Sequence, residues 1–560
     1  MIIMSRTISL TAFAAALLMP VASSQTWKAP VFATHWAAAT GHPLASMAAA
    51  RIFQQGGNAV DAAVAATFVA SVVQQGNTGI GGHGMVLIYH ARTGQVYCID
   101  GSGWSGRNAT PSRFDQTRGG LPADGPLAPV VPGLVSALLT ASQKYGKLQR
   151  AKLIEPAIEL AERGFAVTPY LEGLLNGLQD RMKQYESTRK VWYPGGKPLP
   201  AGTRLRQPDL ADTLRLIARD GGKAFYGGPI ARGVAAWLKR HGGLLEEDDF
   251  AAFAAREGPA LHASYRGYEL YEGPQWSFDH IGLETLNILE GFDLRSLGHL
   301  SPAYIHHVTE AMKLAFADRD WSVEDRGFPE SMPLLVSKPF AAARRAALRA
   351  DRARDPAPRG EIKPGGNTDW VGAIDSERNM VSITSSVSGG FGNMMYIDGP
   401  GGGFFLNNWM PLFKLDPADA NVLAPRKVPR TGWSPMLALK DGKPFGVFGT
   451  PGGDTIPQAQ LQFFIHMADF GMDVQTALEQ PWFRTEAFKA YRYPNAVGKN
   501  LALSGRIPQT TRDALARMGH VITSHDTLGI GSVRAVFFDR SAGTLQAGAA
   551  PGRDESAIGW

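Results

Sequence analysis

The sequence has almost no cysteine, since Cys98 is the single one among 560 residues. One cysteine cannot form an intramolecular disulfide, so a disulfide-stabilised scaffold is excluded. Cys98 lies in the strand-like run QVYCID at 95–100. We predict that it is an inert core thiol rather than a nucleophile, and that a packed core stabilises the fold.

An excess of charge of one sign is also lacking. The chain carries 56 Lys and Arg against 50 Asp and Glu, a net charge of only +6, and no run of five or more basic residues occurs. A nucleic-acid-binding surface needs clustered basic side chains. The sequence therefore predicts no nucleic-acid partner. Its most basic stretch, 341–355, is predicted to be an exposed amphipathic helix.

Long hydrophobic runs are missing as well. The apolar run at 8–21 follows Arg6 and precedes small residues at 22–24. This run is too short to span a bilayer, and the pattern is typical of a secretory signal. We predict a signal peptide over 1–24 and a periplasmic or secreted mature protein without a membrane anchor.

The residues that are present favour a large globular fold. Apolar residues make up 44% of the chain, and glycine is frequent, with 64 positions. Helical patterns dominate 131–250 and recur at 301–321, whereas strand patterns dominate after residue 368. Because helices and strands are segregated rather than alternating, the fold class is predicted to be α+β and not a doubly wound parallel sheet.

Two motifs suggest cofactors but lack the required context. GIGGHG at 79–84 matches GxGxxG, yet a predicted helix precedes it and a predicted strand follows, the reverse of a dinucleotide site. His306, His307 and Glu310 lie within about one helical turn, but a metal site needs further ligands and no HExxH motif occurs. We predict neither a cofactor nor a metal.

A polar loop changes abruptly into a strand at Thr368. The stretch RGEIKPGGNTDWVGAID begins as loop, and from Asp369 it reads as strand. A threonine hydroxyl becomes a useful nucleophile when a base lies beside it, and a free α-amino group on the same residue can be that base. Its pKa of about 8 leaves a neutral fraction near neutral pH. Cleavage between Asn367 and Thr368 would create this amine.

A second pattern supplies a candidate oxyanion hole. In FGTPGGDTIPQ, at 448–458, a predicted strand ends and a predicted helix begins around Gly452 and Gly453. Glycines allow close approach of the backbone, and N–H groups near a helix start favour negative charge.

Several long motifs, in this order, resemble the gamma-glutamyltranspeptidase family of N-terminal nucleophile hydrolases. The resemblance covers nearly the whole chain after the signal. The motifs are QQGGNAVDAAVAATFVASVVQQGNTGIGGHGMVLIY, IEPAIELAERGFAVTP, EAMKLAFADRD, NTDWVGAID, GGGFFLNNWM and GTPGGDT.

The resemblance implies a proenzyme with the four-layer αββα sandwich of that class. Self-cleavage before Thr368 would leave a large subunit, 25–367, and a small subunit, 368–560, together as a heterodimer. The resemblance makes Thr368 the nucleophile and assigns the family's second hydroxyl residue to Ser386. Gly452 and Gly453 match the oxyanion glycines.

The substrate-binding positions depart from the family pattern. Polar or charged groups are replaced at most of them: the family's arginine falls on Ser102, its asparagine on Ser388, its glutamine on Trp409, its aspartate on Leu412, and its paired serines on Thr431 and Gly432. Residues near the altered loops have no assigned role: Arg107, Trp276, Phe278, Asp279 and His280. A site that loses hydrogen-bonding partners disfavours the ligand that needed them.

We therefore predict an N-terminal threonine amidohydrolase or acyltransferase whose small-molecule amide or peptide substrate has a less polar acyl group than γ-glutamyl. One alternative is a true glutathione hydrolase or γ-glutamyltransferase with a remodelled site. A second is a processed, non-catalytic binding protein.

Overall fold

The fold is built around two antiparallel sheets of seven strands each. The computed structural model describes residues 26–114, 120–274, 280–319, 331–354, 367–419, 421–489, 497–525 and 531–560. The first sheet has the order β21 (Ser556–Gly559), β2 (Ala37–Thr40), β10 (Asn367–Ile374), β11 (Met380–Ser388), β3 (His83–His90), β4 (Gln95–Gly101) and β7 (Arg256–Gly258). The second has the order β1 (Val31–Ala33), β20 (Thr544–Ala549), β19 (Arg534–Asp539), β15 (Lys443–Gly449), β14 (Met436–Lys440), β9 (Tyr268–Pro274) and β8 (Ala260–Tyr265).

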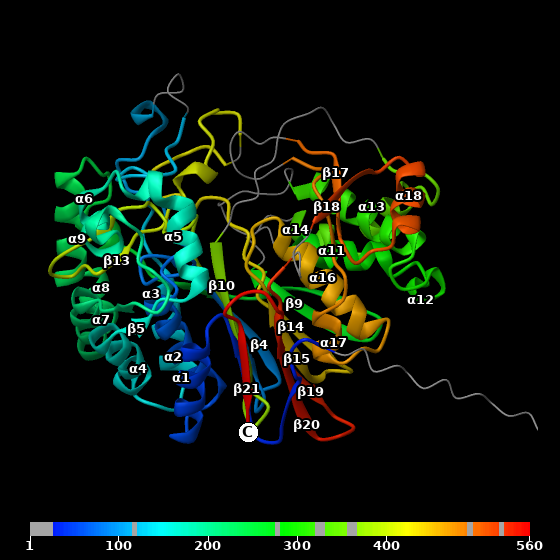
Figure 1. Ribbon diagram of the computed structural model, residues 1–560, viewed down its shortest axis with the longest axis horizontal. Helices are drawn as coiled ribbons and strands as arrows, with labels where there is room; N and C mark the ends of the chain where they lie inside the picture. The colour runs from blue at the N-terminus through cyan, green and yellow to red at the C-terminus, as the bar shows by residue number, and fades with distance from the viewer. Residues whose placement is uncertain are drawn as a thin grey trace, which may run out of the picture.

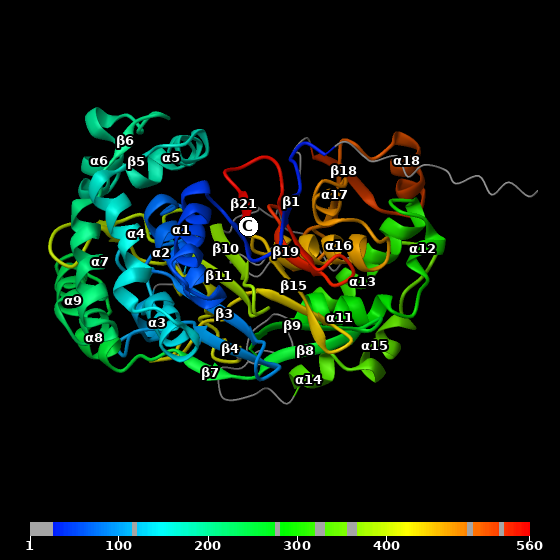
Figure 2. The ribbon, with the colours of Figure 1, turned by 90° about the horizontal axis from the view of Figure 1, so that it is seen from below.

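The two sheets face each other, and helices cover their outer faces (Figures 1 and 2). The first sheet is covered by α1 (Pro43–Gln54), α2 (Ala59–Val73), α3 (Leu134–Tyr145) and α4 (Arg150–Arg163). The second is covered by α11 (His280–Leu289), α13 (Pro302–Arg319), α16 (Thr455–Ala468) and α17 (Val474–Leu478). The expected mixture of helices and antiparallel strands is confirmed.

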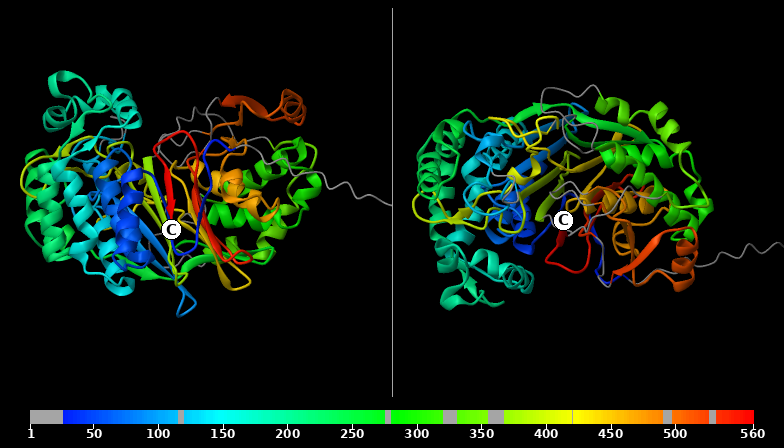
Figure 3. Two further views of the ribbon diagram at one scale, coloured as in Figure 1. Left: turned by 60° about the horizontal axis from the view of Figure 1, so that its bottom comes forward. Right: turned by 90° about the horizontal axis from the view of Figure 1, so that it is seen from above.

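Further elements surround this centre (Figure 3). The further helices are α5 (Pro169–Met182), α6 (Glu186–Trp192), α7 (Pro208–Asp220), α8 (Gly222–Tyr226), α9 (Pro229–Arg240), α10 (Glu247–Ala251), α12 (Leu294–Leu297), α14 (Ser331–Leu335), α15 (Lys338–Arg345) and α18 (Gln509–Arg517). The further strands are β5 (Phe165–Ala166), β6 (Arg204–Leu205), β12 (Tyr396–Ile397), β13 (Phe404–Phe405), β16 (Phe483–Thr485), β17 (Asn500–Ser504) and β18 (Val521–His525). No helix within the described ranges combines the length and apolar character that crossing a bilayer requires.

The central strands are buried on both faces, which explains why they do not alternate between apolar and polar residues. In β10, Val371 and Ala373 pack into the core beneath the helices of the first sheet. Trp370 and Ile374 of the same strand pack into the core between the two sheets. Every residue of β11 is buried. A strand of this kind can only lie in the middle of a layered fold.

Trp370 fills the space between the sheets where glycines make room for it. A Cβ on Gly372 would lie 2.1 Å from the indole, and a Cβ on Gly449 in β15 would also lie 2.1 Å from it. The indole Nε1 donates to Ser382 Oγ at 2.9 Å. Trp370 therefore determines how closely β10 and β15 approach each other.

Several local predictions are confirmed and one is wrong. GIGGHG lies between helix α2 and strand β3, the reversed context that argued against a dinucleotide site. Cys98 is fully buried in β4. The helix predicted over 341–355 ends at Arg345, whose guanidinium donates to two backbone carbonyls of α11. These contacts hold Arg345 against α11, and the chain leaves the helical path after it.

Acid is expected to destabilise the fold through its buried histidines. Burial lowers the pKa of His83, His280, His466 and His520 to about 3 and that of His299 to about 4. In the unfolded chain these imidazoles titrate near 6.5. As the pH falls below about 6.5, the unfolded chain binds protons that the folded chain does not, so the free energy of unfolding decreases. The thermal unfolding midpoint should decrease as the pH is lowered from about 7 to about 5.

The variant H466N is the matched control. Its amide N–H can replace the imidazole Nδ1 that lies 3.2 Å from the carbonyl of Ala477. Because asparagine does not titrate, the midpoint of H466N should change less over the same pH interval. An equal change in both proteins would contradict the assignment of His466.

Candidate active site

Thr368 stands at the start of β10 beside a hydroxyl of the neighbouring strand. It is 7% exposed, and its Oγ1 lies 3.3 Å from Ser386 Oγ in β11. The strand pairing shifts here, since Asn367 faces Ser388 whereas Asp369 faces Ser385. Two residues of β11 therefore lie opposite Thr368. Such bulges re-aim side chains and are frequent next to active sites.

The chain after Ser386 is held in an unusual conformation. Ser388 has a φ of 79°, and its backbone N–H donates to Ser386 Oγ at 2.8 Å. The next residue, Gly389, donates to Asn408 Oδ1 at 2.7 Å. The Asn408 backbone in turn donates to the carbonyl of Val387 at 3.1 Å. Sequence reasoning placed Ser388 at the site but missed Asn408, although the Asn407–Asn408 pair is part of the quoted motif GGGFFLNNWM.

Gly452 and Gly453 form the turn between β15 and α16. Their φ angles are 137° and 59°, a region that favours glycine. Their carbonyls accept from Thr455 and Ile456 in the first turn of α16. Among the described residues, no group accepts a hydrogen bond from the backbone N–H of either glycine. These two N–H groups are free to bind an oxyanion.

The glycine turn begins on the same side of the molecule as Thr368. β10 and β15 lie against each other across the two sheets. Trp370, two residues after Thr368, is the residue against which Gly449 packs at the end of β15. Continuing from Gly449, the chain enters the turn of Gly452.

An aromatic cluster contains two of the altered substrate positions, Ser102 and Trp409. The indole Nε1 of Trp433 donates to Ser102 Oγ at 2.8 Å. Trp409 lies 5.2 Å from Trp433, between ring centroids, and stacks on His83 at 5.3 Å with the rings nearly parallel. Burial keeps His83 neutral, with a pKa of about 3. The cluster is apolar in character and carries no formal charge.

The remaining altered positions lie on neighbouring segments. Leu412 belongs to the same buried cluster as Trp409 and Trp433. Asn421 connects the segments, because its side chain donates to the carbonyl of Leu412 and accepts from the backbone N–H of Arg430 at 3.0 Å. Thr431, which follows Arg430, is buried.

Gly432 is exposed, and a Cβ added to it would meet no atom within 4 Å. A side chain at this position would enter open space.

Two residues without an assigned role are contacted by carboxylates. Arg107 is 46% exposed at its side chain and forms ion pairs with Glu246 and Asp248. These two carboxylates hold its guanidinium at the surface. His280 is fully buried in α11, 3.7 Å from Glu284. The other three residues of this kind, Trp276, Phe278 and Asp279, lie outside the described residues.

A histidine that is distant in the sequence, His520, lies beside His306 and Glu310 of α13. His306, Glu310 and His520 offer ligand atoms within 4.8 Å of one another. Their contacts form a hydrogen-bonded network, in which His306 Nδ1 lies 2.8 Å from His520 Nε2 and Lys313 Nζ lies 2.7 Å from Glu310. The nearby ammonium of Lys313 disfavours a cation here. His307 points elsewhere, toward the carbonyl of its preceding helical turn.

His83 is the functional candidate that sequence reasoning missed. It belongs to GIGGHG, in which the glycine spacing and not the histidine resembles a functional motif. The signal that could have found it is a histidine beside glycines at the start of a strand, where small neighbours leave space for aromatic partners.

Comparison with known proteins gives one consistent answer. The chain matches the family described as Gamma-glutamyltranspeptidase over residues 45–560. It is 34% identical over 530 residues to the Acylase ACY 1 proenzyme of Pseudomonas sp. (strain SE83), with 92% of each chain covered. It is also 34% identical to the Glutathione hydrolase-like YwrD proenzyme of Bacillus subtilis (strain 168), with 92% of this chain and 97% of the relative covered.

A solved structure agrees. The crystal structure of cephalosporin acylase from Bacillus halodurans superposes with a TM-score of 0.87 at 30% identity, covering 97% of this chain and 99% of that one. Fold, motifs and relatives agree, and the chain belongs to the gamma-glutamyltranspeptidase family.

Proposed function

We propose that this protein is a self-processing amidohydrolase or acyltransferase with Thr368 as its nucleophile. The observation that carries the proposal is the contact of 3.3 Å between Thr368 Oγ1 and Ser386 Oγ at the start of β10. It is supported by the N–H groups of Gly452 and Gly453, in the turn that follows β15 of the facing sheet, which have no hydrogen-bond acceptor in the described part of the chain. Relatives named as proenzymes support processing into two subunits.

Self-cleavage would proceed by attack of Thr368 Oγ1 on the carbonyl carbon of Asn367. The C–N bond breaks, the new C–O bond forms an ester, and the threonine nitrogen takes up the proton of the hydroxyl. Water then hydrolyses the ester, which leaves a carboxylate on Asn367 and a free amine on Thr368. Ser386 Oγ would orient the hydroxyl during this step. The products are a large subunit, 25–367, and a small subunit, 368–560.

Turnover would use the new amine as the base. It accepts the proton of Thr368 Oγ1 as the oxygen attacks the substrate amide carbon. The N–H groups of Gly452 and Gly453 stabilise the oxyanion of the tetrahedral intermediate. The ammonium then protonates the leaving amine, and an acyl ester on Thr368 remains. Water, or an acceptor amine, attacks this ester and releases the acyl group.

The acyl group is proposed to be less polar than γ-glutamyl. Trp409 and Leu412, which stand where the family's glutamine and aspartate are expected, share one buried cluster with Trp433. Ser102 is engaged by the indole of Trp433, so its hydroxyl already has a partner. An aromatic or alkyl acyl group would suit such a surface better than a zwitterion.

The alternative substrate is γ-glutamyl itself. It is favoured by relatives named glutathione hydrolase, such as the proenzyme of Pseudomonas sp. (strain A14) at 34% identity. A processed, non-catalytic binding protein is the second alternative.

The proposed function also implies a fold class and a location for the protein. We assign the two facing sheets and their outer helices to the αββα sandwich of N-terminal nucleophile hydrolases. Residues 1–24 are proposed to be removed as an export signal, which would place the mature heterodimer in the periplasm or outside the cell.

The variant T368A tests the processing step. Wild-type protein should separate into two chains on a denaturing gel, and the small chain should begin Thr-Asp-Trp by N-terminal sequencing. T368A should remain one chain because the attacking oxygen is gone. Cleavage of T368A at the same bond would eliminate Thr368 as the nucleophile.

The variant S386A tests the partner hydroxyl. Loss of the group that lies 3.3 Å from Thr368 Oγ1 should slow self-cleavage by about 100-fold, measured as the decay of the uncut chain. S386T is the matched control, because it keeps a hydroxyl on a β-branched residue suited to a strand. Equal rates for S386A and wild type would remove Ser386 from the site.

Comparison of anilide substrates tests the acyl group. Phenylacetyl-p-nitroanilide should be hydrolysed faster than γ-glutamyl-p-nitroanilide by the processed protein. W409Q should lower kcat/KM for the phenylacetyl substrate by about 10-fold relative to W409F, because the aromatic contact is lost. Faster hydrolysis of the γ-glutamyl substrate would favour the alternative, and no hydrolysis of either would favour the non-catalytic protein.

A further inference from the structure

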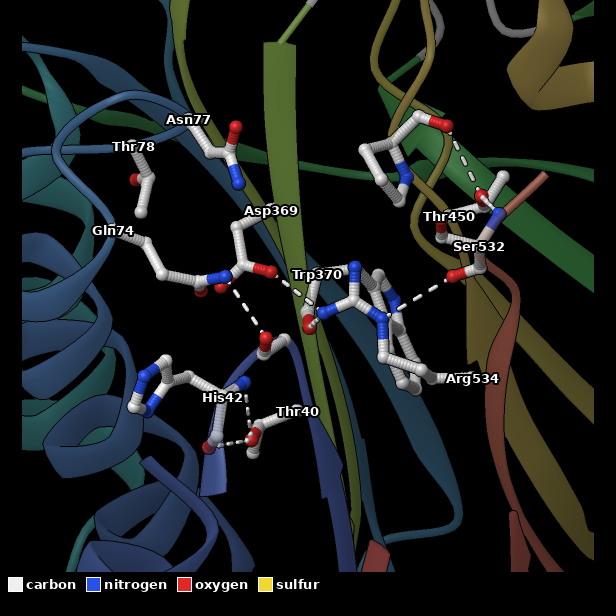
Figure 4. A network of polar contacts seen from close by, with 12 residues as sticks. Thr40, His42, Gln74, Asn77, Thr78, Asp369, Trp370, Thr450, Ser532 and Arg534 are labelled. Atoms are coloured by element: carbon white, nitrogen blue, oxygen red, sulfur yellow. Dashed lines mark hydrogen bonds and ion pairs between the residues drawn. The ribbon is translucent and has the colours of Figure 1, made fainter. Parts of the chain in front are cut away.

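A buried ion pair crosses from one sheet to the other directly after Thr368 (Figure 4). The guanidinium Nη1 of Arg534 in β19 lies 2.6 Å from Asp369 Oδ1 in β10. The two side chains are only 2% and 1% exposed. The same Nη1 also donates to the backbone carbonyl of Trp370 at 2.9 Å. Arg534 therefore contacts both the side chain and the backbone of the strand that presents Thr368.

The other side of Arg534 is linked to the glycine turn. Its Nε donates to the carbonyl of Ser532 at 3.3 Å. The backbone N–H of Ser532 donates to Thr450 Oγ1 at 3.0 Å, and this hydroxyl contacts the carbonyl of Pro451, also at 3.0 Å. Pro451 directly precedes Gly452. A short chain of polar contacts thus runs from Asp369 to the glycine turn, as Figure 4 shows for its labelled residues.

The surroundings leave this ion pair little freedom. A Cβ added to Gly41 would lie 2.1 Å from Asp369 Oδ1, 2.6 Å from Arg534 Nη1 and 2.7 Å from Gln74 Oε1. Gln74 is itself held, since its Nε2 donates to the carbonyl of Gly41 at 2.8 Å. Tight packing together with the planar, multi-donor guanidinium restricts the pair to one geometry.

We propose that Arg534 and Asp369 are positioning residues that set the gap between Thr368 Oγ1 and the N–H groups of Gly452 and Gly453. The inference rests on the proposed role of Thr368. Nucleophile and oxyanion donors belong to different sheets, so their separation depends on what joins the sheets at that end. A displacement of about 1 Å in a catalytic geometry can cost about 100-fold in rate.

Lysine cannot replace Arg534 in this role. A lysine ammonium would keep the positive charge beside Asp369, but it is a compact group on a flexible stem. It cannot reach Asp369 Oδ1, the carbonyl of Trp370 and the carbonyl of Ser532 with one rigid fork. The variant R534K therefore separates geometry from charge.

The test uses R534K, D369N and T450V in the full-length protein. Self-cleavage, followed on gels as decay of the uncut chain, needs no added substrate and should slow by about 10- to 100-fold in each variant. In the processed fraction, kcat for the better of the two anilides should fall by a similar factor while KM stays within about twofold. T450S, which keeps the hydroxyl that accepts from Ser532, should retain the wild-type rates.

D469N is the matched control for a purely structural effect. Asp469 is a buried carboxylate paired with Arg266 at 3.0 Å, beyond the far end of α16 from the glycine turn. Its loss should lower the unfolding midpoint while self-cleavage and kcat remain unchanged.

The outcomes separate this inference from the proposed function. If wild-type protein is cut before Thr368 and either R534K or T450V folds and is cut at the wild-type rate, the inference is overturned. It is also overturned if D469N slows cleavage as much as R534K at equal loss of thermal stability. If wild-type protein is not cut there at all, the proposed function fails instead. T450V exchanges one hydroxyl for a methyl group of similar size. The test therefore remains decisive even where R534K does not fold.

Discussion

The antiparallel ladder between β10 and β11 is the constraint on which the site depends. Regular pairing runs from Ile374 opposite Met380 up to Asp369 opposite Ser385, and then it shifts. The shift places two residues of β11 opposite Thr368, and one of them, Ser386, meets its hydroxyl. Backbone hydrogen bonds thus hold Thr368, the proposed nucleophile, and Ser386 on adjacent strands, where their separation is insensitive to surface loops.

The candidate oxyanion donors come from the second sheet. The N–H groups of Gly452 and Gly453 belong to the turn after β15, which faces β10 across a layer of buried side chains. Trp370 sets the spacing of this layer where Gly372 and Gly449 make room for it. An ion pair between Arg534 and Asp369 crosses the same layer in low dielectric, where a charge without its partner would be costly. Apolar packing sets the distance between the two sheets. The ion pair between Arg534 and Asp369 fixes which residues of β19 and β10 lie opposite each other.

The altered substrate positions and the proposed catalytic groups lie in different parts of the fold. The groups at the head of β10 and in the glycine turn depend on backbone geometry. The altered positions Trp409 and Leu412, and the neighbouring Trp433, lie on segments outside the two central sheets, where replacement of side chains does not disturb the ladder. Trp409 contacts both Trp433 and His83, and the proposed preference for an apolar acyl group rests on these contacts.

Local features were readable from the amino-acid order: the strands around Thr368, the glycine turn and the reversed context of GIGGHG. Each depends on residues close in the chain, so short-range rules of strand patterning and turn formation suffice. The long-range contacts were not readable. His520 joins His306, Trp433 joins Ser102, and Arg534 joins Asp369 across 214, 331 and 165 residues, respectively. Such pairs are decided by tertiary packing, because a side chain's partner in space depends on which distant segments of the chain the fold brings together.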